Sequence, residues 1–177
     1  MPRIIPRIEI GLPARVTNID HITSRPILQL NRGLIVCHYT GAKVKYAMHT
    51  VAQVMAVIRS INRWRANEYN YVIDQRGNVY EFAGEYRAAH AKGYNDTGYG
   101  VLFLNGVGEP MTDAQLASFH YLFGCLLWAG RVQQRPMVVG HKELAATACP
   151  DRIFWRISEM REYSPEWHAK AACVNGA

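Results

Sequence analysis

Three short, uninterrupted runs of apolar residues limit most strongly how this chain can fold. They are LIVCHY at residues 34–39, GYGVLFLNG at residues 98–106 and RPMVVGH at residues 135–141. Turn-forming or polar residues bound each run, and its apolar residues do not alternate with polar ones. Such runs are typical of strands buried on both faces of a sheet. Because a buried sheet needs helices to cover it, we expect an α/β fold.

Helical segments and a hairpin fill the chain around these runs. Three segments are expected to be helices: residues 49–64, 112–133 and 150–163. The second opens with a capping box, in which Thr112 is followed three residues later by Gln115. Residues 69–82 predict a β-hairpin, and residues 7–10 predict one further short strand. The order of elements predicts a mixed central β-sheet flanked by helices.

The length of the chain favours one domain. Its 177 residues allow one substantial core and are too few for two large ones. We expect a single domain over residues 1–177, with residues 1–33 as an N-terminal arm and residues 164–177 as a C-terminal tail. Prolines break the N-terminal segment, which lacks the apolar core of a signal peptide, and no run approaches the roughly 20 apolar residues of a membrane span. We therefore expect the protein to be made in the cytoplasm and exported, if at all, by other machinery. We also expect it to be a monomer.

The charge of the chain limits which classes of binding partner are expected. Formal net charge is +6 and the sequence pI is about 9.3. A modest positive excess suits an acidic partner, such as nucleic acid, anionic lipid or an anionic cell-wall polymer. The arginines are scattered and form no dense basic run. Nucleic acid is therefore not the expected partner.

Two histidines and a cysteine stand where a metal ion could be bound. His38 ends the first apolar run, His141 ends the last, and Cys149 follows eight residues later, just before a predicted helix. Zinc takes nitrogen and sulfur ligands, and the start of a helix should favour the Cys149 thiolate. The alternative is that all three are packing residues, and spacing alone leaves both open. Cys37 should lie on the opposite strand face from His38.

Four segments occur in an order that is specific to one family. They are LIVCHYTGAK, EYNYVIDQRGNVYEF, AAHAKGYNDTGYGVLFLNG and GHKELAATACPD. Together they resemble the zinc-dependent N-acetylmuramoyl-L-alanine amidases of the type-2 amidase family, which includes small phage endolysins and the peptidoglycan recognition proteins. The resemblance runs from about residue 34 to residue 156 and leaves the arm and tail outside it. It implies the fold of that family.

The resemblance also implies how the metal and the reacting bond are held. By position, it makes His38, His141 and Cys149 the ligands of Zn²⁺. The eight-residue step from His141 to Cys149 fits the branch with a thiolate ligand better than the branch with aspartate. Tyr69 matches the tyrosine whose hydroxyl reaches the zinc-bound water or the scissile carbonyl.

Two further residues concern the substrate groove, and two others are departures from the family pattern. The resemblance implies that His90 and Asn95, in one loop, contact the substrate. The resemblance also implies that Thr147, two residues before Cys149, is a second catalytic residue. Small phage amidases can carry lysine at this position. Asn70 is a second departure, where relatives often have histidine, and it receives no role. A threonine can only donate a neutral hydrogen bond to an oxyanion.

The function implied by the resemblance is hydrolysis of the amide between N-acetylmuramic acid and L-alanine in bacterial peptidoglycan. A single-domain phage endolysin that acts in host lysis, on peptidoglycan reached after release from the cell, fits the basic charge. A secreted antibacterial amidase effector would fit the same features. A different class of function is a recognition domain that binds peptidoglycan without cutting it. The complete ligand set argues against that class, because non-catalytic relatives commonly lose a ligand.

Overall fold

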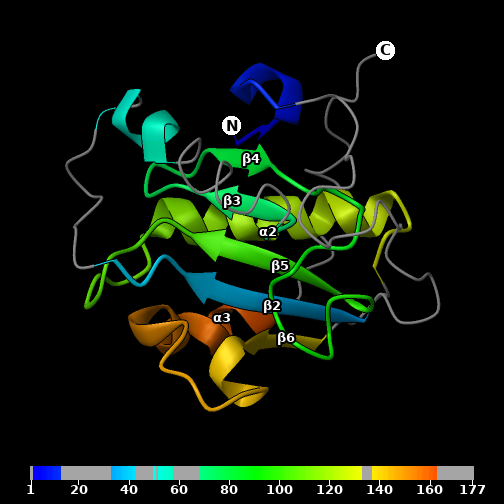
Figure 1. Ribbon diagram of the computed structural model, residues 1–177, viewed down its shortest axis with the longest axis vertical. Coiled ribbons are helices and arrows are strands. Elements are labelled where there is room, and N and C mark those ends of the chain that lie inside the picture. The colour runs from blue at the N-terminus through cyan, green and yellow to red at the C-terminus, as the bar shows by residue number, and fades with distance from the viewer. Residues whose placement is uncertain are drawn as a thin grey trace.

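A six-stranded mixed sheet lies at the centre of the computed structural model, which describes residues 2–12, 33–42, 50, 52–57, 68–132 and 137–162. Its strand order is β1-β4-β3-β5-β2-β6 (Figure 1). The strands are β1 (Ile4–Ile5), β2 (Leu34–Tyr39), β3 (Tyr71–Ile73), β4 (Val79–Glu81), β5 (Gly98–Phe103) and β6 (Met137–Gly140). All paired strands are parallel except β3 and β4, which form the predicted hairpin. The sheet confirms the predicted α/β class.

Strand β2 lies between β5 and β6 and divides its side chains between two faces. Ile35 and Cys37 belong to the core on one face, whereas Val36 packs on the other face with Val139. His38 follows Cys37 and therefore shares the face of Val36. Cys37 is fully buried, and it is separated from His38 as predicted.

Helix α2 (Asp113–Trp128) covers the Cys37 face of the sheet. Phe119 and Leu122 of this helix pack in one core cluster with Tyr99 and Phe103 of β5. Figure 1 shows α2 behind β3 and β5, and the short helix α3 (Ile157–Arg161) packs against β6. The predicted capping box opens α2, since Thr112 and Gln115 exchange hydrogen bonds. Among the described residues, no helix has both the length and the apolar character that a membrane span requires.

The opposite face carries a smaller core. Residues 52–57 are helical there, and Val54 packs in a cluster with Val72 of β3 and Leu102 of β5. Residues 49, 51 and 58–64 of the helix predicted over residues 49–64 lie outside the described residues. So do most of the predicted arm and the whole predicted tail.

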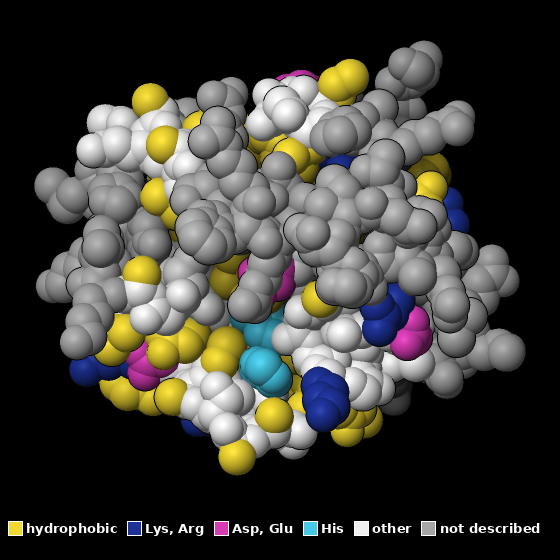
Figure 2. All heavy atoms as spheres, in the orientation of Figure 1, with side chains coloured by type: hydrophobic (Ala, Val, Ile, Leu, Met, Phe, Trp, Pro, Cys, Tyr) yellow, Lys and Arg dark blue, Asp and Glu magenta, His cyan; other side chains and the backbone are white. Residues whose placement is uncertain are grey.

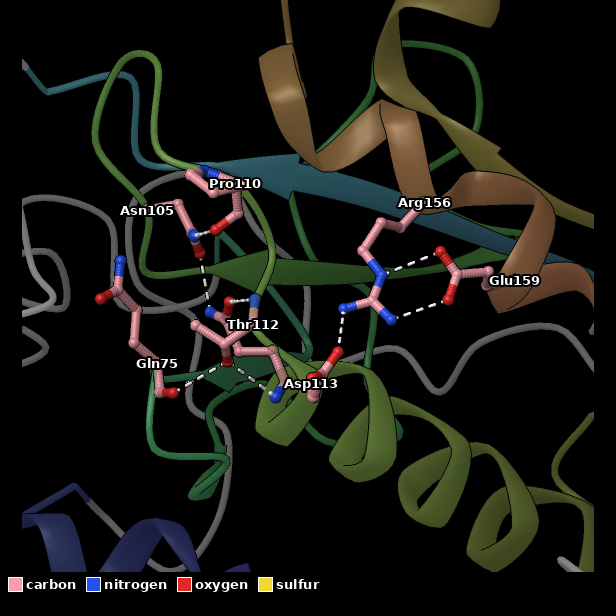
Figure 3. A network of polar contacts seen from close by, with 8 residues as sticks. Gln75, Asn105, Pro110, Thr112, Asp113, Arg156 and Glu159 are labelled. Atoms are coloured by element: carbon pink, nitrogen blue, oxygen red, sulfur yellow. Dashed lines mark hydrogen bonds and ion pairs between the residues drawn. The ribbon is translucent and has the colours of Figure 1, made fainter.

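Polar contacts hold the start of α2 against two other segments (Figure 3). The Thr112 hydroxyl donates to the carbonyl oxygen of Gln75 in the hairpin turn, at 2.9 Å. The guanidinium of Arg156 lies 2.6 Å from the carboxylate of Asp113 and pairs twice with the carboxylate of Glu159, at 2.7 and 2.9 Å. The segment that follows Cys149 is thereby tied to the main helix.

Two predicted elements differ from the structure. Residues 7–10 form a 3₁₀ helix, η1 (Arg7–Ile10), and the strand of the arm is β1, two residues long. Arg7 and Ile10 are both buried, which is the three-residue repeat of a 3₁₀ turn and not the alternation of a strand. The last predicted helix begins as the 3₁₀ helix η4 (Asp151–Arg156) before α3, and the φ of 52° at Asp151, its first residue, lies outside the range of either helix type.

Candidate metal centre

Three side chains predicted as metal ligands converge at one end of the sheet. β2 and β6 are parallel, and Cys37 pairs with Gly140, so His38 and His141 follow neighbouring strands at the same edge. Cys149 joins them from the loop before η4. One ligand atom from each of the three lies within 4.8 Å of the others. Figure 2 shows histidine side chains on this face beside hydrophobic ones.

The distances suit a zinc ion. Nδ1 of His38 lies 3.6 Å from Sγ of Cys149, and the rings of His38 and His141 have centroids 4.7 Å apart. Zinc bonds of about 2.0–2.1 Å to nitrogen and about 2.3 Å to sulfur, at a tetrahedral angle, place these two ligand atoms about 3.6 Å apart. Two imidazoles and one thiol also match the ligand types that zinc prefers. The three residues therefore fit a zinc ion, whose tetrahedral geometry takes a fourth ligand.

The loop from His141 to Cys149 is closed by hydrogen bonds. The amide of Lys142 donates to the carbonyl oxygen of Cys149 at 2.7 Å. The Glu143 carboxylate accepts from the amide of Gly140 at 2.8 Å and pairs with the Arg161 guanidinium at 2.9 Å. These contacts fold the eight-residue step back on itself, which brings both of its ends to His38.

Gly140 is a site residue that the sequence analysis did not single out. A Cβ atom at this position would lie 2.7 Å from Cδ2 of Phe154 and 2.8 Å from Cδ of Pro150. The missing side chain lets η4 approach the end of β6 closely, so that Cys149 reaches the two histidines. A glycine directly before a histidine at the end of a strand was the only signal of this in the sequence.

Burial sets the protonation of the two histidines. Burial lowers the pKa of His38 well below its usual 6.5, and the neighbouring His90 and His141 lower it further. Burial also lowers the pKa of His141. Both rings are therefore neutral at pH 7 and offer a lone pair to a metal.

The thiol of Cys149 behaves differently from the prediction. Burial raises its pKa to about 11, and a hydrogen bond from the backbone of Tyr39 opposes only part of that rise. A six-residue 3₁₀ helix, η4, follows Cys149 in place of the predicted α-helix, and burial leaves the pKa of the thiol raised where the sequence analysis expected it to be lowered. Without metal the thiol keeps its proton at neutral pH, so a metal ion must displace it.

The two predicted catalytic residues lie beside the ligands. Tyr69 precedes β3, and its ring centroid is 5.2 Å from that of His38. Thr147 is exposed, and its hydroxyl oxygen accepts a hydrogen bond from the amide of Cys149 at 3.2 Å. A hydroxyl that accepts at its oxygen can still donate its proton to another group. Their catalytic roles stay predictions.

The two predicted substrate residues have neighbours within the protein. His90 is only 5% exposed and lies behind His38, with 3.4 Å between Nδ1 of His90 and Nε2 of His38. Asn95 accepts a hydrogen bond from the amide of Ala91 at 2.8 Å through Oδ1. Substrate contact by these residues stays a prediction, and the structure adds a contact between His90 and a metal ligand that the sequence analysis did not foresee.

Asn70, which received no role from the sequence, links three segments next to Tyr69. Its side chain is fully buried and donates to the carbonyl oxygens of Gly84 and Tyr86, each at 2.8 Å. Its Oδ1 accepts from the amide of Gly100 at 2.7 Å. These bonds join the start of β3 to β5 and to the loop after β4. The signal was a polar residue within an otherwise apolar strand.

Comparison with known proteins identifies relatives of this arrangement. The family described as N-acetylmuramoyl-L-alanine amidase (Amidase_2) matches residues 30–152. A peptidoglycan-recognition protein of Drosophila simulans is 28% identical over 150 residues, which cover 82% of this chain and 81% of that protein. The N-acetylmuramoyl-L-alanine amidase of Mus musculus is 28% identical over 140 residues, which cover 73% of this chain and 26% of that protein.

Solved structures share the fold. Bumblebee PGRP-SA superposes with a TM-score of 0.75 at 24% identity, covering 93% of this chain and 99% of that chain. Peptidoglycan recognition protein-LE, solved in complex with tracheal cytotoxin, a monomeric diaminopimelic acid-type peptidoglycan, gives a TM-score of 0.75 at 22% identity, covering 92% and 97%. Both superpositions confirm the prediction that this chain has the fold of the peptidoglycan recognition proteins.

Proposed function

Because the chain belongs to the N-acetylmuramoyl-L-alanine amidase family, we propose that it is a zinc-dependent amidase that cleaves the amide between N-acetylmuramic acid and L-alanine in bacterial peptidoglycan. The observation that carries this proposal is the convergence of His38, His141 and Cys149 on a space that suits zinc. Amide hydrolysis is difficult, and the donor set suits a metal that can assist it.

Each residue around the candidate metal centre has a separate role in this proposal. His38, His141 and Cys149 would hold Zn²⁺, which when bound polarises a carbonyl and lowers the pKa of water. Tyr69, beside His38, would donate a hydrogen bond to the oxyanion that develops on the scissile carbonyl. Thr147 would offer a second, neutral donor from the ligand loop. His90 and Asn95 belong to the loop next to the centre, where the glycan or the stem peptide would lie.

A second candidate function is binding of peptidoglycan without cleavage. It is favoured by relatives such as peptidoglycan recognition protein-LE, whose structure was solved with a peptidoglycan fragment. A binding domain has no need of three metal ligands, however. The presence of all three, with a ligand spacing that suits zinc, supports cleavage over binding alone.

The setting that we favour is lysis of a bacterial host by a phage endolysin, with a secreted antibacterial amidase as the alternative. The net charge of +6 supports attraction to anionic cell walls. The protein would be made in the cytoplasm as a monomer and would act on peptidoglycan after release. Expression in bacteria with and without export to the periplasm tests this setting. Lysis that requires export supports it, and export without lysis contradicts it.

The proposed activity is tested by metal removal. Purified protein should clear a suspension of bacterial cell walls, should lose this activity after chelation, and should regain it on addition of zinc. The matched variant Cys149→Ser should remain inactive in all three conditions. Clearing by the chelated protein would refute zinc dependence.

A further inference from the structure

A row of hydrogen-bonding atoms runs from the backbone of β5 through His90 to the ligand His38. Nε2 of His90 lies 3.1 Å from the carbonyl oxygen of Gly98. Nδ1 of His90 lies 3.4 Å from Nε2 of His38, and Nδ1 of His38 lies 3.6 Å from Sγ of Cys149. His38 therefore directs one ring nitrogen to the metal centre and the other to His90.

The donor and acceptor capacities of these atoms decide which atom donates in each hydrogen bond. A backbone carbonyl can only accept a hydrogen bond, so Nε2 of His90 must donate its proton to Gly98. A neutral imidazole has one N–H, so Nδ1 of His90 is left as an acceptor. Nε2 of His38 must then donate, and Nδ1 of His38 keeps its lone pair. That lone pair points to the side where Cys149 lies.

We infer that His90 is a positioning residue, which fixes the tautomer and the ring orientation of His38 so that Nδ1 is its metal-binding atom. This inference rests on the proposed function, because it assumes a metal at His38, His141 and Cys149. It gives His90 a task that does not need contact with the substrate. The partner of a histidine ligand typically changes metal affinity by about 10- to 100-fold.

The fold makes room for this arrangement. His38 is 1% exposed and His90 is 5% exposed, so water does not compete readily for the bond between them. A Cβ atom at Gly100 would lie 2.6 Å from Cβ and 2.9 Å from Cδ2 of His90. Strand β5 therefore supplies both the acceptor for His90, at Gly98, and the space for its ring, at Gly100.

The test compares zinc affinities of the full chain. His90→Leu keeps bulk and removes the acceptor, and it should weaken zinc binding by about 10- to 100-fold in competition with a chromophoric chelator. His90→Asn can place an acceptor oxygen near the position of Nδ1 and should recover much of the affinity. His120→Leu is the matched control, since His120 is a partly buried histidine of α2 whose Nε2 contacts the carbonyl of Glu159 at 3.0 Å. It should bind zinc as the wild type does.

The outcomes separate the inference from the proposed function. A wild-type chain that binds no zinc refutes both. A wild-type chain that binds zinc, together with a His90→Leu chain of equal affinity, refutes only the inference. A raised KM with unchanged zinc affinity would assign His90 to the substrate and overturn it.

A second pair of variants guards against loss of folding. If His90→Leu does not fold, as judged by circular dichroism, His90→Asn is compared with His90→Gln. Glutamine can reach the Gly98 carbonyl but offers no acceptor at the position of Nδ1. The asparagine variant should bind zinc more tightly, and equal affinities would overturn the inference.

Discussion

The burial of Cys149 should make zinc binding depend steeply on pH. In the metal-free chain, burial raises the pKa of the thiol from 9.0 to about 11, whereas burial lowers the pKa values of His38 and His141 from 6.5. Between pH 7 and pH 9, zinc must therefore displace the thiol proton, while both imidazoles already offer lone pairs. Because the free state holds this proton and the bound state does not, affinity rises with pH and levels off only near the thiol pKa of about 11.

The size of the effect follows from one displaced proton. Zinc affinity should rise about tenfold, or about 1.4 kcal/mol, for each pH unit, and therefore about 100-fold between pH 7 and pH 9. The rise of the thiol pKa from 9.0 to about 11 costs roughly 3 kcal/mol of binding free energy at pH 7, compared with an unburied thiol.

The assay compares the wild type with Cys149→Asp. Aspartate is ordinarily ionised above about pH 4, so its ligand oxygen needs no proton removed at neutral pH. Zinc dissociation constants are measured at pH 7, 8 and 9 by competition with a chelator of known pH dependence. The slope of log affinity against pH should be steeper for the wild type by about one, and any other proton that zinc displaces is common to both proteins. Equal slopes would refute the account of Cys149.

Four further substitutions test three individual residues. Cys149→Ser removes the thiolate and should cost both bound zinc and activity, and a variant that keeps stoichiometric zinc and full lysis would show that the ligand is wrongly assigned. Tyr69→Phe should keep fold and zinc but lose about 2–4 kcal/mol of transition-state stabilisation, seen as a lower kcat. An unchanged kcat would remove Tyr69 from the mechanism. Thr147→Ala should lose less, about 1–2 kcal/mol, and Thr147→Lys should be tolerated because it returns a cation near the developing charge. If Thr147→Ala loses more than Tyr69→Phe with zinc retained, the two residues are ranked in the wrong order.

The convergence of His38, His141 and Cys149 could be predicted because it depends on features that are local in sequence. The apolar runs that end at His38 and His141 indicate buried strands, and neighbouring parallel strands bring such ends to one edge of the sheet. A short loop joins Cys149 to His141, so the position of Cys149 near His141 also depends mainly on residues that are close in sequence. The capping box at Thr112 was likewise readable, since it needs only two residues three apart.

What could not be predicted depends on contacts between distant residues. The raised pKa of Cys149 comes from burial by other segments, which outweighs any local effect of the turn that follows it. The contact of His90 with His38 spans 52 residues and depends on the space left by Gly100. The alternating letters of residues 7–10 suggested a strand, but the structure buries Arg7, which donates to the carbonyl of Phe82, and Ile10, one 3₁₀ turn later.

Mass spectrometry of peptidoglycan digests tests the proposed activity most directly. Purified peptidoglycan is incubated with zinc-loaded wild type and, in parallel, with Cys149→Ser, and the soluble products are identified. The wild type should release intact stem peptides with a free amino group on L-alanine, and should leave glycan strands whose lactyl groups end in a carboxylate. The variant should release neither. Peptidoglycan that binds the zinc-loaded wild type but yields no such products would contradict the account and would identify the chain as a recognition domain.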